Sequence, residues 1–210
     1  MFFEPARGHP LPRNPFKACV VPRPIGWIST RSPAGVNNLA PYSFFNGVAD
    51  SPPMVMFANN GNQPHGPKDT VENAIATGEF VANLATFDLR GAMNASSEAA
   101  RPEVDEFALA GLTAAPCRIV SAPRVAETPI AMECRVVTSV ELPARPGGRN
   151  TVVFGEVVGI HIDERVLTEG LVDMAKLKPI SRLGYKDYAV VIETFSMDRP
   201  AGGDRLVGMG

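Results

Sequence analysis

The feature that most constrains the fold of this chain is a 13-residue stretch with a period of two. From position 130 to 142, every even position carries an apolar residue, a cysteine or a threonine, and most odd positions are polar. Such alternation is typical of a long strand with one buried and one wet face. Residues 152–162 repeat the pattern after turn-forming residues at 143–148. The two segments predict a long antiparallel hairpin.

The positions of the prolines divide the rest of the chain. Twelve of the 20 prolines lie within residues 1–67, and none lies between positions 68 and 101. Because proline is poorly tolerated inside helices and central strands, the first third should hold edges, turns and extended segments. We predict strands at 20–30, 39–45, 54–58, 79–86 and 189–197, and helices at 88–100, 103–110 and 171–177, with a further helix starting at Asp69.

Residues 69–78 carry the signals of a complete helix. Asp69 can cap its start, and Glu72 three positions later completes a capping-box pattern. Val71, Ala74 and Ile75 share one face, and Gly78 can end the helix. Long alternating strands with helices confined to one region favour a mainly β fold, an antiparallel barrel with inserted helices.

Composition excludes several classes of protein. The formal net charge of −2 implies no attraction to nucleic acid or to anionic membranes, and no run of about 18 apolar residues predicts a membrane span. Three scattered cysteines and three scattered histidines predict neither a disulfide framework nor a metal site. The start lacks a signal-peptide pattern, so we expect a cytoplasmic protein. We divide it into a proline-rich arm (1–18), one domain (19–200) and a tail (201–210).

Residues 32–67 stand out because they are polar but nearly uncharged. Asp50 is the only charged side chain among these 36 residues, while asparagines are frequent. Amides and backbone groups suit a neutral, flat ligand that needs orienting hydrogen bonds. The alternative is a buried loop or subunit contact in which amides serve turns.

The segment ends at the start of the predicted helix. A helix N-terminus offers free N–H groups to an anion, and Lys68 and Thr70 add a charge and a hydroxyl. These residues could form a phosphate site. The alternative is an ordinary helix start with a solvated lysine.

Several motifs in these regions resemble one known family. They are Val-Pro-Arg-Pro-Ile-Gly-Trp-Ile-Ser-Thr (21–30), Asn-Leu-Ala-Pro-Tyr-Ser-Phe (38–44), Lys-Asp-Thr (68–70), Glu-Phe-Val-Ala-Asn (79–83), Glu-Cys-Arg-Val (133–136), Gly-Ile-His-Ile (159–162) and Arg-Leu-Gly-Tyr (182–185). Together they resemble the flavin reductase-like family, which includes flavoredoxin-like and ferric reductase-like proteins. The resemblance covers about residues 16–198.

The resemblance implies a Greek-key, antiparallel split β-barrel that forms a homodimer with FMN near the subunit interface. By the same resemblance, the cofactor-binding residues would be Thr30, Arg31, Asn38, Leu39, Ala40, Pro41, Tyr42, Ser43, Asn59, Lys68, Asp69, Thr70 and Asn83. Residues 38–43 would line the flavin ring and ribityl chain, and Lys68 and Thr70 would hold the phosphate above a helix capped by Asp69.

The implied reaction is hydride transfer from NADH or NADPH to flavin N5, a step in which the protein mainly positions the reactants. No catalytic side chain is required, and His161 and Arg182 are candidates for the nicotinamide site. For His161 the alternative is a barrel histidine that faces solvent or a neighbouring strand. Electrons would pass to an acceptor protein, to ferric iron or to a separate monooxygenase. Two alternatives share the same pocket: an electron carrier without nicotinamide activity, and a protein that senses or stores FMN.

The chain departs from the family pattern at one position. Members usually carry arginine directly before Lys-Asp-Thr, and this chain carries Pro67. Either a phosphate-binding charge is missing from this chain, or Arg31 or His65 supplies it.

Overall fold

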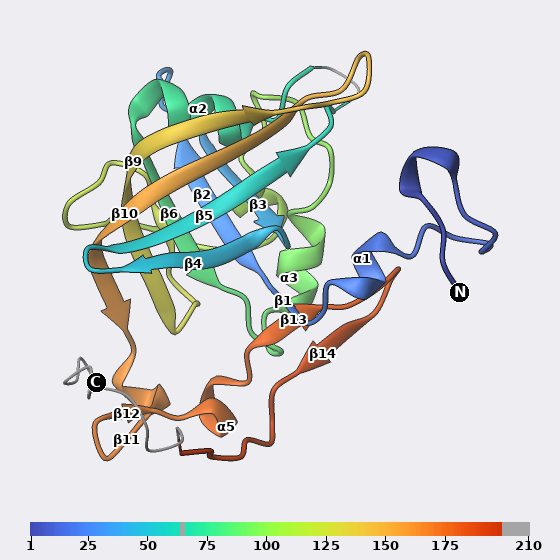
Figure 1. Ribbon diagram of the computed structural model, residues 1–210. Helices are drawn as coiled ribbons and strands as arrows, with labels where there is room; N and C mark the ends of the chain where they lie inside the picture. The colour runs from blue at the N-terminus through green and yellow to red at the C-terminus, as the bar shows by residue number, and fades with distance from the viewer. Residues whose placement is uncertain (64–65, 199–210) are drawn as a thin grey trace.

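The computed structural model describes residues 1–63 and 66–198, and its centre is a seven-stranded antiparallel sheet in the order β3-β2-β6-β9-β10-β5-β4 (Figure 1). Its strands are β2 (Gly26–Arg31), β3 (Asn37–Tyr42), β4 (Phe45–Asp50), β5 (Pro53–Asn60), β6 (Glu79–Leu84), β9 (Ile130–Leu142) and β10 (Asn150–Ile162). The sheet curls into a barrel, and β3 and β5 come into contact although they are not paired. This architecture confirms the predicted split barrel.

The predicted hairpin is the longest element of the barrel. β9 and β10 pair from Ile130↔Ile162 to Leu142↔Asn150, with register shifts at Phe154/Gly155 and Val157/Gly159. The predicted pattern of burial is only partly correct, because Glu133 on the expected wet face is buried and Val140 on the expected dry face is exposed. Glu133 is buried because the backbone of residues 118–120 covers this face of β9 and donates to its carboxylate, and the outer half of β9 is exposed.

Helix α2 (Asp69–Thr77) packs against the barrel and contacts β2, β3, β6, β9 and β10. Val71 and Ala74 of the helix join Ile28, Phe57 and Phe80 in the barrel core. Gly78 ends the helix in a left-handed conformation, as predicted. The predicted Asp69 cap is wrong. The helix begins at Asp69 itself, Lys68 is the cap residue, and the Lys68 side chain forms no capping hydrogen bond. Asp69 therefore occupies the first turn rather than the cap.

Two short helices and a second core cover the other end of the barrel. α3 (Arg90–Ala95) and α4 (Glu106–Leu109) are shorter than the predicted helices at 88–100 and 103–110. Asp105 caps α4 by accepting a hydrogen bond from Phe107 N. Trp27, Leu39 and Phe107 lie in this second core.

The ends of the chain meet beside the barrel. β1 (Arg23–Pro24), β13 (Ile180–Arg182) and β14 (Tyr188–Val190) form a three-stranded sheet. α1 (Phe16–Cys19) packs its Ala18 against Gly184, so the proline-rich arm ends in a docked helix. The strand predicted at 189–197 is wrong after Val190, because residues 191–198 are exposed and form no strand. The predicted tail, 201–210, lies outside the described residues.

The smaller elements complete the described chain. They are η1 (Pro5–Arg7), β7 (Ala114–Ala115), β8 (Arg124–Val125), η2 (Glu164–Val166), β11 (Leu167–Thr168), β12 (Leu171–Val172) and α5 (Met174–Leu177). α5 covers only the end of the helix predicted at 171–177. Within the described residues, no helix has the length and apolar character needed to span a membrane.

Candidate functional site

The predicted ligand-binding stretch lies where β3 meets the start of α2. Thr70 Oγ1 donates a hydrogen bond to Asn38 Oδ1 at 2.6 Å, which joins the helix to the strand. Lys68 is half-buried, and its ammonium group lies 5.3 Å from the centre of the Tyr42 ring. Burial, followed by repulsion from Lys17, lowers the Lys68 pKa. An anion bound next to Lys68 would therefore stabilise the charged form of its ammonium group.

A cavity of about 310 Å³ opens at this junction. Six predicted residues line it: Asn38, Ala40, Pro41, Tyr42, Lys68 and Thr70. The cavity wall also includes Gln63, whose buried Oε1 has no hydrogen-bond partner among the described residues. Lys68 and Thr70 here suit a negatively charged ligand and Gln63 Oε1 suits a hydrogen-bond donor, while the carboxyl groups of Glu98 and Glu106 line the same wall.

A second cavity, of about 470 Å³, adjoins the first, and the two share Pro41 and Ser97 as lining residues. Its wall includes the predicted residues Ser43 and Arg182. Arg182 stacks over the Tyr188 ring at 4.4 Å. We call the two cavities together the groove. It runs from the start of α2 to the sheet formed by β1, β13 and β14.

Arg23 fixes one wall of the groove and was not predicted. Its guanidinium donates to Val20 O at 2.6 Å and to Leu183 O at 2.9 Å, and also to Lys17 O. Its Nε lies 3.4 Å from Ser43 Oγ. Burial, and then the charge of Arg182, lowers the Arg23 pKa. Because these donors bind protein oxygens, Arg23 ties three segments together rather than binding a ligand.

The N-terminal arm also contributes to the groove, which sequence reasoning missed. Asn14 and Lys17 line the second cavity together with residues of β13 and of the following turn. No motif in residues 1–18 indicated this role, because it depends on the docking of α1 against Gly184.

Several predicted residues are absent from the described groove walls. Thr30 and Asn83 are buried in the barrel, where Asn83 Nδ2 donates to Trp27 O at 2.9 Å and Asn83 Oδ1 accepts from Val125 N at 2.9 Å. Asn59 donates to Gly61 O at 3.0 Å. The other three are Arg31, Leu39 and Asp69, of which Arg31 donates to Asn37 Oδ1. Among them, Thr30 lies behind the groove wall, since its Oγ1 is 3.4 Å from Asn38 Oδ1. His65, considered as a source of charge, lies outside the described residues.

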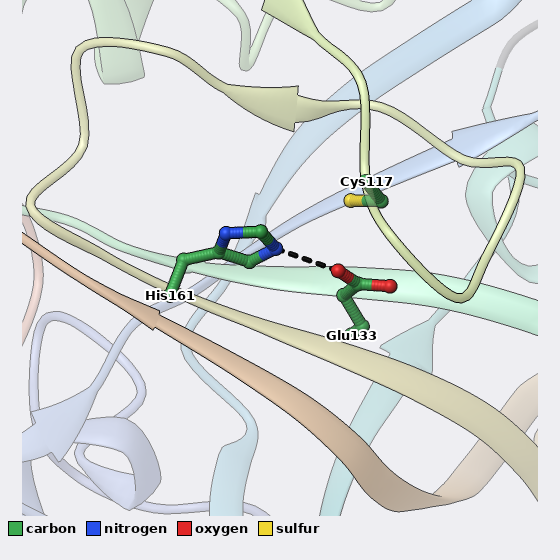
Figure 2. A group of neighbouring side chains, drawn as sticks. All are labelled: Cys117, Glu133 and His161. Atoms are coloured by element: carbon green, nitrogen blue, oxygen red, sulfur yellow. Dashed lines mark hydrogen bonds and ion pairs between the residues drawn. The ribbon is translucent and has the colours of Figure 1, made fainter.

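His161 and Arg182, the two candidates for the nicotinamide site, line different cavities within one chain. The His161 Nε2 is 2.6 Å from Glu133 Oε1 on the neighbouring strand β9, in agreement with the alternative of a histidine that faces a neighbouring strand (Figure 2). The His161 cavity, of about 470 Å³, is also lined by Arg118 and Arg124.

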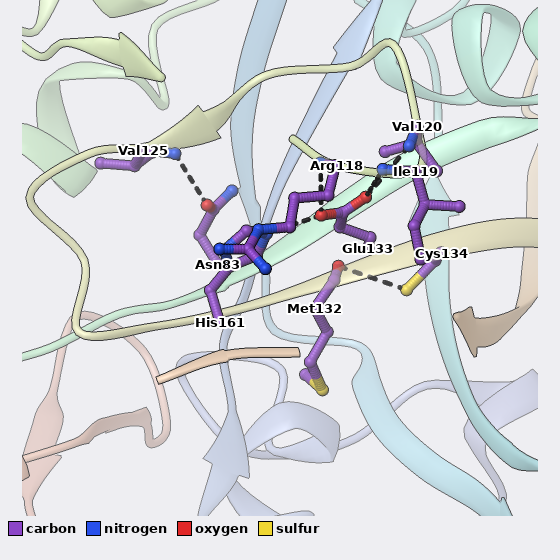
Figure 3. A network of polar contacts seen from close by, with 9 residues as sticks. All are labelled: Asn83, Arg118, Ile119, Val120, Val125, Met132, Glu133, Cys134 and His161. Atoms are coloured by element: carbon purple, nitrogen blue, oxygen red, sulfur yellow. Dashed lines mark hydrogen bonds and ion pairs between the residues drawn. The ribbon is translucent and has the colours of Figure 1, made fainter. Parts of the chain in front are cut away.

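Cys117 lies beside this pair, and the ligand atoms of Cys117, Glu133 and His161 are within 4.8 Å of one another. Three backbone N–H groups, of Arg118, Ile119 and Val120, donate to the Glu133 carboxylate at 2.7 to 3.0 Å (Figure 3). Burial opposes the charge, but these donors and His161 lower the Glu133 pKa to about 2. Burial, reinforced by Glu133, raises the Cys117 pKa to about 12. The Glu133 carboxylate anchors the 117–120 loop to the barrel, because both of its oxygens already accept hydrogen bonds. The Cys117 thiol beside it keeps its proton at neutral pH.

A family model described as a flavin reductase like domain matches residues 18–180. The chain belongs to the flavin reductase-like family. An uncharacterized protein of Aquifex aeolicus is 42% identical over 170 residues, which is 80% of this chain and 84% of the relative.

Two solved structures are similar to this chain over most of its length. Nitrilotriacetate monooxygenase component B from Bacillus cereus is 31% identical with a TM-score of 0.81, over 90% of this chain and all of that one. The 2-nitrobenzoate 2-nitroreductase NbaA from Pseudomonas fluorescens is 26% identical with a TM-score of 0.77, over 93% of this chain and 92% of that one. The family and fold expected from the sequence motifs are therefore confirmed.

Proposed function

We propose that this chain is an FMN-binding oxidoreductase that catalyses NAD(P)H-dependent reduction of its flavin and passes the electrons to a separate acceptor. Membership of the flavin reductase-like family and two oxidoreductase neighbours support the reaction class. We further propose that it acts in the cytoplasm as a homodimer with FMN near the interface.

The observation that carries this proposal is the composite groove. A flavin mononucleotide joins a flat ring to a phosphate through a polar chain. The groove offers adjoining cavities of about 310 and 470 Å³, with Lys68 and Thr70 at one end and Pro41 shared between them. The start of α2 adds the positive end of a helix dipole. Pro67 occupies the position before Lys-Asp-Thr, and Arg31, one candidate for supplying the charge, donates to Asn37 and does not line the groove.

The donor set fits such a ligand. Gln63 Oε1 is buried at the first cavity without a hydrogen-bond partner in the part of the chain that the structure describes, and the half-buried Lys68 lines the same cavity. We propose that Lys68 and Thr70 hold the phosphate. Residues 38–43 would orient the ring through the backbone of β3 and through the flat surfaces of Pro41 and Tyr42. The remaining predicted residues would not contact FMN and would hold the groove residues in place; they are Thr30, Arg31, Leu39, Asn59, Asp69 and Asn83.

When bound, FMN supplies a ring that accepts a hydride at N5 and releases electrons singly or in pairs. The chain's task is then to bind the ring, to shield one of its faces and to leave the other accessible. Arg182, in the second cavity, is suited to the nicotinamide substrate, because its guanidinium can pair with a phosphate. The proposed role of His161 in that site has less support within one chain. A partner monooxygenase is supported by the 31% identical component B.

Binding is tested by fluorescence titration of flavin-free protein with FMN and with riboflavin. We expect Lys68→Ala to weaken FMN binding about tenfold or more, because a half-buried charge contact is worth about 1.4 kcal/mol or more. Riboflavin, which has no phosphate, should bind both forms alike. Arg135→Ala, which removes an exposed cation on β9, is the matched control. Equal FMN affinity of wild type and Lys68→Ala would refute the phosphate assignment.

The reaction is tested by rapid mixing of FMN-loaded protein with NADH or NADPH. Bleaching of the visible flavin band supports the reductase. Absence of bleaching with either nucleotide would refute it in favour of a flavoredoxin-like electron carrier or an FMN-storing protein.

A further inference from the structure

Glu106 is a buried carboxyl group in the wall of the first cavity, and its role is not explained by the fold. It occupies the first position of α4, is only 4% exposed and lines the same cavity as Lys68 and Thr70. Burying a carboxylate costs several kcal/mol unless it is paired or protonated. Among the described residues, no cation forms an ion pair with it.

Two hydrogen bonds from β3 to Glu106 fall on the same carboxyl oxygen. Asn38 Nδ2 and the backbone N–H of Leu39 both donate to Oε2 at 3.1 Å. Asn38 in turn accepts the hydrogen bond from Thr70 at the start of α2. A chain of contacts thus connects Glu106 to the proposed phosphate site. Oε1 forms no side-chain hydrogen bond to the described residues, so it is the oxygen on which a proton can sit.

The surroundings favour the neutral form of this group. Burial raises the Glu106 pKa to about 7, against its hydrogen bonds from Leu39 and Asn38 and with the charge of Asp69. The titratable and charged groups on the elements around it are Arg31 of β2, Tyr42 of β3, Lys68 before α2, Asp69 and Glu72 of α2, Arg90 of α3, Glu98 after α3 and Asp105 before α4. Acidic groups outnumber cations in this set. A further negative charge in the cavity would therefore favour protonation of Glu106.

We propose that Glu106 is the proton-accepting residue of the cofactor site, an inference that rests on the proposed function. When the phosphate-bearing cofactor enters the cavity, the Glu106 carboxylate takes one proton from solvent and becomes a neutral carboxylic acid. An O–H bond forms on Glu106, no other bond changes and no electrons are transferred. The repulsion between a carboxylate and a phosphate in one poorly hydrated cavity provides the driving force. In both protonation states Oε2 keeps Asn38 and Leu39 in place.

One substitution can remove the titration of Glu106 without removing the oxygen that accepts its hydrogen bonds. Glu106→Gln removes the titration but leaves one carbonyl oxygen able to accept from both Asn38 and Leu39. Glu103→Gln makes the same chemical change at an exposed position before α4 and is the matched control.

The experiment is calorimetric titration of flavin-free protein with FMN at pH 7.5 in buffers that differ in ionisation enthalpy. We expect wild type and Glu103→Gln to take up about half to three-quarters of a proton per FMN. Glu106→Gln should take up close to none. Between pH 7 and 8.5 the wild-type Kd should rise by up to about tenfold per pH unit, and the Glu106→Gln Kd should stay nearly constant. Riboflavin should cause much less proton uptake.

The outcomes separate this inference from the function on which it rests. FMN binding by wild type without proton uptake, or with uptake retained in Glu106→Gln, overturns the role of Glu106 and leaves the function intact. Absence of FMN binding by wild type overturns both. If Glu106→Gln does not fold, the infrared difference spectrum of wild type with and without FMN gives the answer. A protonated-carboxyl band that appears on binding supports the proposal, and its absence refutes it.

Discussion

At the scale of single residues, two buried glutamates of the same chain have opposite electrostatic environments. Glu133 receives three backbone N–H groups and His161, and its pKa falls to about 2. Glu106 receives two hydrogen bonds on one oxygen, and burial raises its pKa to about 7. The number of donors facing the carboxylate, rather than burial alone, decides which form is stable.

This difference predicts how stability depends on Glu133. Glu133→Gln should lower the free energy of unfolding at pH 7 by about 3 kcal/mol, because an amide cannot satisfy all four donors. Since the folded-state pKa is depressed, the stabilisation is present above the unfolded value of about 4.3 and is lost as the pH falls toward 2.

Urea unfolding at pH 7 and at pH 3 measures this effect, with the exposed Glu164→Gln as control. The gap between wild type and Glu133→Gln should be smaller at pH 3. A gap that does not change between the two pH values would contradict the assignment.

The sequence predicted the residues of the groove better than it predicted their roles. Lys68, Thr70, Asn38 and residues 40–43 could be found because each belongs to a short, specific motif, whereas Leu39 lies in the second core. Glu106 and Arg23 could not be found in this way. Glu106 meets Asn38 across 68 positions of chain, and Arg23 meets Leu183 across 160. Such contacts depend on the pairing of distant strands, which local patterns do not determine.

At the scale of secondary structure, the β9–β10 hairpin depends on a close contact at Gly155. A Cβ atom there would lie 2.4 Å from Phe80 Cε1 and 2.5 Å from Cζ. Phe80 is fully buried and stacks edge-on against Phe57 at 5.1 Å, so it has little room to move. Gly155→Ala should therefore destabilise the protein by about 2 kcal/mol or more.

The control for this prediction is Gly91→Ala in α3. A Cβ at position 91 would meet no atom within 4 Å, and alanine favours the helix. Gly91→Ala should leave the melting temperature unchanged or slightly raised. If the two variants melted at the same temperature, the proposed steric role of Gly155 would be wrong.

Element boundaries were predicted well where periodicity was long and poorly where it was short. The period of two gave β9 its exact bounds, Ile130–Leu142. β4 was missed because residues 45–50 have five exposed positions and no clear alternation. The final strand was predicted too long, since it ends at Val190. Residues 191–197 have the apolar pattern of a strand, but such a pattern does not show whether a neighbouring strand is there to pair with it.

At the scale of the whole molecule, apolar side chains remain exposed towards the C-terminal end. They include Ile160 and Ile162 at the end of β10, Leu171, Ile192, Phe195 and Met197, with exposed fractions of 44% to 86%. In Figure 1 the chain after β14 runs below the barrel, away from the main sheet. Apolar surface of this kind is typical of a protein–protein contact, which supports the proposed homodimer.

Sedimentation velocity tests this arrangement. We expect wild type at micromolar concentration to sediment with twice the 22.4 kDa mass of one chain. The double variant Ile192→Ser, Phe195→Ser should shift the population toward the monomer, because both exposed side chains would lose their contacts with the second copy. Val137→Ser, at an exposed position of 52% on β9, is the control and should remain dimeric. A wild type that sediments as a monomer would refute the dimer. A double variant that remains fully dimeric would show that the second copy contacts another face of the barrel.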